Sequence, residues 1–481
     1  MKILLINPPR ANELIGKNPA IIEKHRGYNL PLGLLYLAAA IKKYNKFEVK
    51  ILDTQPLNWT YEQLQTYLGK DSYDVVGITA MTFTLIDVFK TVAMVKKNLP
   101  QAKVVLGGTH VHLYPQETIN LKGVDFVLKG EAEESFITFL ENINNPENYP
   151  TIPGLMYKDQ QGKVVQNDFA PIQNIDTITF PAREMVDKNQ YGSLLSRRRL
   201  STTFISSRGC PFHCAFCDRP LSPVTSVFRT RSAKNVVDEL AECVEMGICD
   251  FLFYDDTFTV DKKRVFEICE EIIRRKLKIR WDIRTRVDMV EKKMLKALKT
   301  AGCVGIHYGI EAGNNRMLEV IKKGFTIEKV KETFNLTRQA GIDTLAYFMI
   351  GLPSETLADI QDSFNLAKAV RPAYAHFTIF SPYPGTEFYA QGLKQGIIKT
   401  DLWQEFSREP RPGFKLPVWE ENFKREELFG LLVKFYRGFY LRPGYVLSRA
   451  VKIRSAHELF KKTKAALSVL GMNKKNVDVI D

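Results

Sequence analysis

Cysteine is scarce in this sequence, and long apolar runs are absent from it. The chain has seven cysteines in 481 residues. It has no stretch of roughly eighteen consecutive apolar residues that could cross a bilayer. Its first residues, MKILLINPPR, lack the long apolar stretch and cleavage site of a signal peptide, and they predict a first strand. We therefore expect a cytoplasmic protein with reduced thiols, which disfavours disulfides and favours metal or redox chemistry for the cysteines.

Acidic residues are scarce toward the C-terminus. The net charge is +14, and from Lys434 to Lys475 many bases are accompanied by a single acid, Glu458. Aromatic and aliphatic residues are interleaved with these bases, which suits a peripheral contact with the inner membrane surface and a lipid substrate. The alternative is a helical cap with a solvated basic face. A nucleic acid partner is not expected, because no RNA-binding module is recognisable.

The first 150 residues alternate apolar, β-rich runs with helical patterns. The runs lie at 2–9, 47–56, 74–82, 102–110 and 124–131. Five such strands with helical crossovers predict a doubly wound parallel sheet. A sheet of this kind binds its ligands at the carboxyl ends of the strands. Residues 151–200 predict a connector that includes a hairpin turning at Gln161 and Gly162.

The same alternation returns between residues 201 and 382. Candidate strands lie at 202–207, 250–255, 279–286, 304–310, 343–350 and 374–380. Six β/α units predict a partial barrel of parallel strands, in which the residues after each strand share one rim. Residues 383–481 show helical amphipathic patterns. The predicted fold class is thus α/β, with a Rossmann-like doubly wound sheet, a (β/α)6 partial barrel and a helical, basic C-terminal region.

Three of the cysteines are gathered in SSRGCPFHCAFCDRP, directly after the first strand of the predicted barrel. Cys210, Cys214 and Cys217 are spaced C-x3-C-x2-C. Three thiolates can hold three corners of a cubane iron–sulfur cluster, and the fourth iron then stays open, as in a catalytic metal site. The alternative is a zinc site that borrows His213 or a distant cysteine, although no second cysteine pair follows. The other four cysteines fit buried structural thiols.

This cysteine motif, its aromatic residue and its place before β/α repeats resemble the radical SAM superfamily. The resemblance implies that the three cysteines hold a 4Fe–4S cluster and that S-adenosylmethionine (SAM) binds the open iron through its amino and carboxylate groups. One electron then cleaves SAM to methionine and a 5′-deoxyadenosyl radical, which abstracts hydrogen from the substrate. An external electron donor of the flavodoxin or ferredoxin type is implied as a partner. Phe216 is expected near the adenine.

Polar residues after the next barrel strands extend this resemblance. Asp255 and Asp256 follow the second strand, where the family contacts the SAM amino group and a carboxylate complements an ammonium. For one of the two, a helix N-cap is the alternative. After the third strand, Arg284 or Arg286 could pair the SAM carboxylate or form a structural ion pair. Glu311, after the fourth strand, could bind ribose hydroxyls.

The stretch FMIGLPSET ends the fifth strand of the predicted barrel. Gly351 and Pro353 would allow a close approach to the backbone, and Glu355 is expected to cap the next helix.

The front domain resembles the cobalamin-binding domain that one branch of this superfamily carries. Its candidate contacts after the third, fourth and fifth strands are Thr79, Thr82, Thr84, Gly107, Gly108, Gly130 and Glu131. Glycine lets a bulky ligand reach the backbone. The signature D-x-H-x-x-G, whose histidine binds cobalt in several corrinoid enzymes, is absent. His25, His110 and His112 lack its spacing, so no cobalt-ligating histidine is assigned.

Together the two cofactors imply an enzyme that methylates an unactivated carbon of a small molecule or lipid. The 5′-deoxyadenosyl radical would remove hydrogen, and methylcobalamin would donate the methyl group. One alternative is cyclisation, ring rearrangement or carbon–carbon coupling without methyl transfer. An alternative of another class is a non-catalytic iron–sulfur binding or sensor protein.

Overall fold

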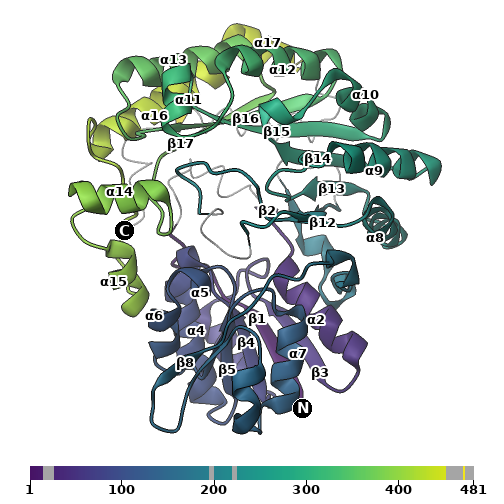
Figure 1. Ribbon diagram of the computed structural model, residues 1–481, viewed down its shortest axis with the longest axis vertical. Coiled ribbons are helices and arrows are strands. Elements are labelled where there is room, and N and C mark those ends of the chain that lie inside the picture. Colours follow the sequence, from purple (N-terminus) through teal and green to yellow (C-terminus); the bar gives the residue numbers. More distant parts are fainter. Residues whose placement is uncertain (15–26, 194–199, 219–224, 451–469, 472–481) are drawn as a thin grey trace.

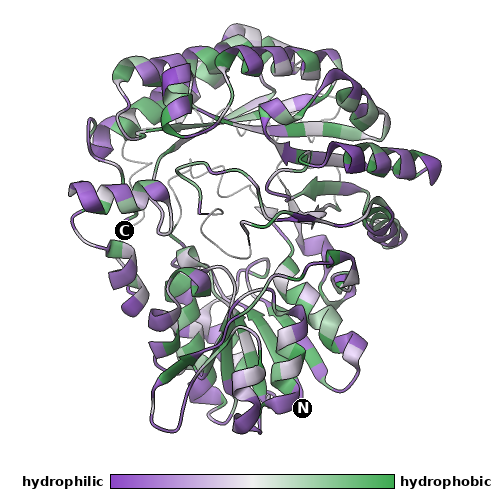
Figure 2. Cartoon of the chain, viewed as in Figure 1, coloured by the Kyte–Doolittle hydropathy of each residue, from purple (hydrophilic) through white to green (hydrophobic). Residues whose placement is uncertain are grey.

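The computed structural model describes residues 1–14, 27–193, 200–218, 225–450 and 470–471. Within these ranges the chain forms two α/β halves, the N-terminal half below and the later half above in Figure 1. Figure 2 shows hydrophobic residues concentrated on the strands and hydrophilic residues on the outward faces of the helices. His25 and most of the basic tail lie outside the described residues.

The lower half is built on a seven-stranded sheet. In spatial order its strands are β3 (Glu48–Asp53), β1 (Lys2–Asn7), β4 (Val75–Thr79), β5 (Lys103–Gly107), β6 (Phe126–Leu128), β7 (Leu155–Lys158) and β8 (Val164–Gln166). The first five run parallel, as expected. The hairpin turning at Gln161 and Gly162 is present as β7 and β8, which extend this sheet antiparallel. The sheet therefore continues beyond residue 150.

Helices cover both faces of this sheet. They are α2 (Leu32–Tyr44), α3 (Tyr61–Leu68), α4 (Leu85–Asn98), the short α5 (His110–Leu113) and α6 (Pro115–Asn120), and α7 (Ala132–Asn142). The central residues of β1, Ile3 to Ile6, are fully buried, because a parallel strand with helices on both sides has no solvent face. Two separate apolar clusters, one on each face, hold the helices in place.

The upper half contains a six-stranded, all-parallel sheet that curves into the predicted partial barrel. Its strands, neighbours in chain order, are β10 (Thr202–Phe204), β13 (Asp250–Phe253), β14 (Arg280–Thr285), β15 (Cys303–Glu311), β16 (Asp343–Ile350) and β17 (Tyr374–Ile379). Its helices are α8 (Ala233–Glu245), α9 (Lys262–Arg274), α10 (Lys292–Thr300), α11 (Asn315–Val320), α12 (Ile327–Gln339) and α13 (Leu357–Val370). The helices lie outside the curved sheet (Figure 1).

Two small antiparallel pairs lie near the cysteine segment. One joins β2 (Gly27–Tyr28) to β9 (Gly192–Ser193), so the first half contacts the connector. The other joins β11 (Ser207–Arg208) to β12 (Arg229–Thr230) and frames the cysteine loop.

The C-terminal region is helical, as expected, and contacts both halves. Its helices are α14 (Glu387–Gln395), α15 (Leu402–Arg408), α16 (Arg425–Tyr440) and α17 (Pro443–Ala450). α15 packs on α6 of the lower half, and Trp403 is buried in the apolar cluster of that half. α16 packs on β17 and α13 of the upper half. No helix among the described residues is long and apolar enough to span a membrane.

Candidate active site

A cavity of about 370 Å³ lies where the carboxyl ends of the lower sheet face the rim of the partial barrel. From the lower half it is lined by residues that include Thr79, Gly107, Gly108, Leu128 and Gly130. From the upper half it is lined by Ser207, Arg208, Gly209, Tyr254 and Asp256. The cavity therefore brings the candidate cobalamin contacts next to the residue that precedes the first cysteine.

Glycine keeps the lower wall of this cavity open. Gly108 has a φ of +104°, and a Cβ there would lie 2.7 Å from the backbone oxygen of Ala80. A side chain at this position would be strained and would clash with the backbone. Gly107 ends β5 beside it, and Gly130 lines the same wall. A flat ligand can thus reach the backbone at three places.

The three threonines predicted for the cobalamin site differ in position. Thr79 lines the cavity. Thr82 is buried instead, with its hydroxyl 3.1 Å from Nδ1 of His110, and the hydroxyl of Thr84 donates to the Met81 carbonyl. Thr82 and Thr84 therefore stabilise the turn after β4, and only Thr79 reaches the cavity.

His110 and His112 lie behind the cavity wall. Nε2 of His112 accepts a hydrogen bond from the Gly130 N–H at 3.3 Å, and its Nδ1 is buried without a partner. His110 is fully buried. Burial lowers the pKa of both imidazoles to about 4. No histidine belongs to the described residues that line the cavity.

Glu131 lies at the cavity, but its carboxylate is already paired. Its oxygens lie 2.6 Å from Arg229 and 3.0 Å from Arg208, both from the upper half. Burial opposes ionisation of Glu131, but the hydrogen bond from Arg229 and the charges of both arginines outweigh it, so the pKa lies below its ordinary value. The sequence predicts Glu131 as a cobalamin contact, whereas in the structure its carboxylate joins the two halves.

Backbone geometry fixes the cysteine loop above the cavity. Gly209 has a φ of +85°, and a Cβ there would lie 2.2 Å from the Val227 oxygen. The Cys210 N–H donates to the Thr225 carbonyl, and the Cys217 N–H donates to the carbonyl of Cys214. Only glycine lets the two sides of the loop approach this closely.

The thiols of this loop are partly exposed, and that of Cys214 lies next to cations. Nη1 of Arg286 is 3.9 Å from Sγ of Cys214, and Sγ of Cys210 is 3.7 Å from the Thr257 hydroxyl. Burial raises the pKa of Cys214, while the charges of Lys323 and Arg286 lower it. Nearby cations favour thiolates.

The three sulfurs do not converge on a single ion. Among the described residues, no three His, Cys, Asp or Glu side chains converge on a point that could hold one metal ion. A cubane binds each thiolate at a separate iron, so its ligands need not converge on one point. By contrast, burial raises the pKa of Cys243 and Cys269 to about 12, as expected of structural thiols.

The two aspartates after β13 have separate roles. Asp255 is buried and accepts hydrogen bonds from the Ser206 N–H and from the hydroxyls of Ser206 and Ser207, at 2.6 to 2.7 Å. It therefore fixes the chain before the cysteine loop. Asp256 is exposed and lines the cavity. Neither aspartate caps the following helix, because the N-cap of α9 is Asp261.

Arg286 lies on the cysteine side of the barrel rim. It pairs with Asp288 at 2.9 Å and contacts the Cys214 thiol. The structural ion pair that the sequence analysis gave as an alternative for Arg286 is thus present. One nitrogen of the Arg286 guanidinium nevertheless faces the cysteine loop.

Glu311, Lys323 and Phe216 are neighbours close to the same loop. Nζ of Lys323 is 3.3 Å from Glu311 and 5.4 Å from the ring centre of Phe216. Glu311 has a φ of +75°, a strained conformation for a non-glycine residue that is often found at functional sites. Lys323 was missed by sequence reasoning, because it comes from the segment after α11 and no local pattern connects it to the cysteines.

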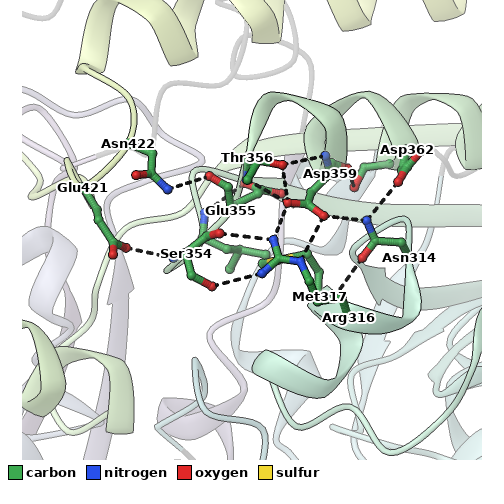
Figure 3. A network of polar contacts seen from close by, with 12 residues as sticks. Asn314, Arg316, Met317, Ser354, Glu355, Thr356, Asp359, Asp362, Glu421 and Asn422 are labelled. Carbon is green, nitrogen blue, oxygen red and sulfur yellow. Dashed lines mark hydrogen bonds and ion pairs between the residues drawn. The ribbon is translucent and has the colours of Figure 1, made fainter.

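The loop after β16 is held by Glu355, but not as a helix cap. Thr356 is the N-cap of α13 and forms a capping box with Asp359. Glu355 turns back and accepts the N–H groups of Gly351 at 2.6 Å and Leu352 at 3.0 Å. Figure 3 shows the polar network around this loop, in which Arg316 pairs with Asp359. The cap predicted at Glu355 was therefore wrong by one residue.

Comparisons with known proteins agree with this geometry. A model described as the radical SAM superfamily matches residues 204–367, and a B12 binding domain model matches residues 19–140. An uncharacterized methyltransferase of Pyrococcus horikoshii is 33% identical over 94% of this chain and 97% of its own length. The chain belongs to the radical SAM superfamily. The cofactors of this radical SAM enzyme are accordingly a 4Fe–4S cluster, SAM and cobalamin.

Other proteins are similar to this chain over most of its length. An anaerobic magnesium-protoporphyrin IX monomethyl ester cyclase of Rubrivivax gelatinosus is 26% identical over 86% of this chain and 74% of its own. The solved structure of the cobalamin-dependent SAM radical enzyme OxsB superposes with a TM-score of 0.72 and 16% identity, covering 98% of this chain and 72% of that one. The likeness to OxsB confirms the predicted fold.

The residues present fit these cofactors. Three partly exposed thiols, one of them beside Arg286 and Lys323, suit an electron-rich cluster. The wall suits a flat corrin, because Gly107, Gly108 and Gly130 line it and glycine has no side chain to keep a ligand from the backbone. Both features open on the same interdomain region.

Proposed function

We propose that this enzyme C-methylates an unactivated carbon of a small-molecule or lipid substrate. The observation that carries this proposal is the shared cavity. It is lined by Gly107 and Gly108 of the B12-binding half and by Gly209 and Asp256 of the radical SAM half. When bound, the cluster and SAM supply a 5′-deoxyadenosyl radical, and methylcobalamin supplies a methyl group. A substrate placed between the two halves can be reached from both sides.

Different residues of this chain would hold the cluster and SAM. Cys210, Cys214 and Cys217 would hold the cluster. Asp256 would bind the SAM amino group and Arg286 the carboxylate, since charge-assisted hydrogen bonds are the strong ones.

The remaining proposed contacts complete the two cofactor sites. Glu311 would bind the ribose, and Phe216 would lie against the adenine. Thr79, Gly107, Gly108 and Gly130 would form the cobalamin wall, while Glu131 and Asp255 would position the walls without touching a cofactor. The packed interface around the cavity would exclude water from the reactive carbon.

The main rival is a cyclisation or rearrangement without methyl transfer. The cyclase relative supports this rival, and the methyltransferase relative supports C-methylation. The greater identity and coverage of the methyltransferase favour methylation, although neither name fixes the substrate.

A labelled-methyl experiment distinguishes these outcomes. Anaerobically purified protein would be reconstituted with iron, sulfide and cobalamin, then given SAM with a labelled methyl group, a reductant and candidate substrates. Methylation requires labelled product together with 5′-deoxyadenosine. Unlabelled, rearranged product would establish the rival. If a reconstituted protein with full iron content forms no 5′-deoxyadenosine, the non-catalytic sensor is the better description.

The C-terminal region is the part of the chain considered for contact with a membrane. Most apolar residues of α16 are buried against the barrel, which favours the helical cap over a free membrane-binding helix. On α17, however, Val446 is 51% and Leu447 is 68% exposed, and Arg442 directly precedes the helix, whereas Arg449 pairs with Asp343. We propose that this end of the molecule contacts an anionic membrane peripherally. Vesicles of anionic lipid should sediment the protein at low salt, and failure to do so would refute the contact.

A further inference from the structure

Four polar residues form a polar face on the inside of the partial barrel. They are not among the residues proposed to hold the cofactors. Arg284, His307, Tyr347 and His376 come from the consecutive strands β14, β15, β16 and β17. Arg284 is in register with His307, and Tyr347 is in register with His376. Their strand neighbours, such as Ile283, are buried in the cluster beneath the helices. Because side chains alternate along a strand, these four point into the barrel.

The four side chains are neighbours in space as well as in register. The Tyr347 hydroxyl is 3.3 Å from Nδ1 of His307, and the ring of His376 packs edge-on against the Tyr347 ring at 5.6 Å. The guanidinium of Arg284 stacks over the ring of Tyr254 at 3.7 Å. Tyr254 in turn lines the cavity between the two halves. The polar face therefore begins at the cavity and continues into the barrel.

Arg284 differs from the buried arginines of this protein. Arg183, Arg229, Arg231, Arg264 and Arg286 each pair with a carboxylate. Arg284 forms no ion pair within the described part of the chain, and its Nε is buried without a hydrogen bond. A half-buried charge without a counterion is costly, so an anionic ligand would relieve it.

The neighbouring histidines can donate hydrogen bonds without adding charge. Burial, reinforced by the charge of Arg284, lowers the pKa of His307 to about 3, and burial lowers the pKa of His376 to about 4. Both rings are therefore neutral at neutral pH, and each carries one N–H. A guanidinium with imidazole and phenol donors beside it matches the oxygens of a carboxylate or phosphate.

The position of this face also agrees with a substrate role. Glu311 is in register with Phe348, the residue after Tyr347, so the proposed SAM contact lies on the neighbouring strand at almost the same level. Tyr254 connects the other end to the cobalamin side. Arg286 already faces the cysteine loop, so a second arginine is not needed for the SAM carboxylate.

We propose that Arg284, His307, Tyr347 and His376 bind the anionic oxygen group, a carboxylate or a phosphate, of the enzyme's substrate. This rests on the function proposed above, because only then does a substrate lie between the two cofactors. Arg284 provides the charge, and the two imidazoles and the phenol orient the group.

Anion binding tests this proposal independently of turnover. Inorganic phosphate and succinate would each be titrated calorimetrically into reconstituted protein with cobalamin bound. The variant is Arg284→Gln, and the matched control is Arg280→Gln. Arg280 lies on the same strand and face, roughly 13 Å away along the strand, and its Nε is also buried without a partner. At least one anion should bind the parent protein, with a tenfold or greater loss in R284Q and no change in R280Q.

The affinities measured for the two anions and for SAM decide whether the proposal holds. Preference for phosphate indicates a phosphorylated substrate, and preference for succinate indicates a carboxylic acid. No binding to the parent protein, equal binding to R284Q, or equal loss in R280Q overturns the assignment. Loss of SAM affinity in R284Q would also overturn it, because Arg284 would then serve the SAM carboxylate.

A charge-retaining variant and a measurement of 5′-deoxyadenosine formation serve as controls. R284K should keep part of the anion affinity, because it retains the positive charge, and formation of 5′-deoxyadenosine from SAM and reductant is measured on the parent protein. If the parent protein forms none, the proposed function fails, whereas the anion result stands on its own.

Discussion

At the scale of single residues, the chemistry of each cysteine follows from the polarity around it. Burial raises the pKa of Cys214 above its usual value, but the charges of Lys323 and Arg286 oppose the rise. Cys269 belongs to the apolar cluster of the upper half, and burial raises its pKa to about 12. The same side chain is therefore a ligand in one place and a small apolar residue in the other.

Replacing Cys214 by Ala should prevent stable binding of the 4Fe–4S cluster, because one iron loses its ligand. Iron and sulfide analysis after anaerobic reconstitution should show most of the cluster lost, and no 5′-deoxyadenosine should form. Cys269→Ala is the matched control, with full iron content and a stability loss of about 1 kcal/mol. Equal iron in both variants would contradict the assignment.

Glu355 is a buried carboxyl whose pKa is strongly raised. Burial raises its pKa from 4.5 to about 7, although the N–H groups of Gly351 and Leu352 oppose the rise. The folded state then binds its proton more tightly than the unfolded state does. Its contribution to stability is therefore full below about pH 4.5 and is lost as the pH rises through 7.

Glu355→Gln should remove this pH dependence. At pH 5 the variant and the parent protein should have similar stability. At pH 8 the variant should be the more stable, by at most about 3 kcal/mol. Urea unfolding at both pH values measures the difference, and parallel stability curves for the two proteins would show that Glu355 ionises normally.

At the scale of elements, the exposed edge of the partial barrel is closed by tyrosines of the C-terminal region. β17 is the last strand of its sheet, so one side of its backbone lacks a partner strand. The Tyr436 hydroxyl bonds the N–H and the carbonyl of Phe377, at 3.3 and 3.1 Å. The Tyr440 hydroxyl bonds both backbone groups of Ala375 in the same way. α16 thus takes the place of a further strand.

Tyr436→Phe should lower the free energy of unfolding by about 1 to 3 kcal/mol, since it leaves two buried backbone groups without a partner. Denaturant unfolding measures this loss. The Tyr436 hydroxyl contacts the Phe377 backbone and none of the residues proposed to hold a cofactor, so cofactor content should stay the same. A change below about 0.5 kcal/mol would mean that water replaces the hydroxyl.

At the scale of the whole molecule, the two halves are joined by buried charges and by the returning C-terminal segment. Glu131 of the lower half pairs with Arg208 and Arg229 of the upper half. On the other side, the Tyr114 hydroxyl donates to Asp401, and Gln404 donates to Glu117. The cavity lies between the halves, so these contacts set its width.

Glu131→Gln should destabilise the protein by about 3 to 5 kcal/mol, because it removes the buried charge that Arg208 and Arg229 share. Glu184→Gln is the control. It removes a surface pair with Lys42, with side chains 49% exposed, and should cost less than about 1 kcal/mol. Calorimetry and the absorbance of bound cobalamin measure both effects. If E131Q retains cobalamin with parental stability, the ion pairs do not hold the halves together.

Local sequence patterns determined the elements and the cysteine motif. Alternating apolar runs and helical patterns predicted the five parallel strands of the first sheet and the six of the barrel, because hydrophobic periodicity is a local property. The spacing of Cys210, Cys214 and Cys217 is also local, and it identified the family before any contact was known. Glycines after strands, such as Gly107 and Gly108, could be placed because parallel strands end at one edge.

The tertiary structure decided which polar groups are free to act. Sequence alone did not show that Glu131 and Asp255 are occupied by partners from distant segments, or that Lys323 lies beside Glu311. It also did not distinguish the surroundings of Arg284 from those of Arg286, although the two arginines are only two residues apart in the sequence. Whether a charge is paired or buried depends on residues from other elements that pack around it. Only the folded structure shows which residues these are.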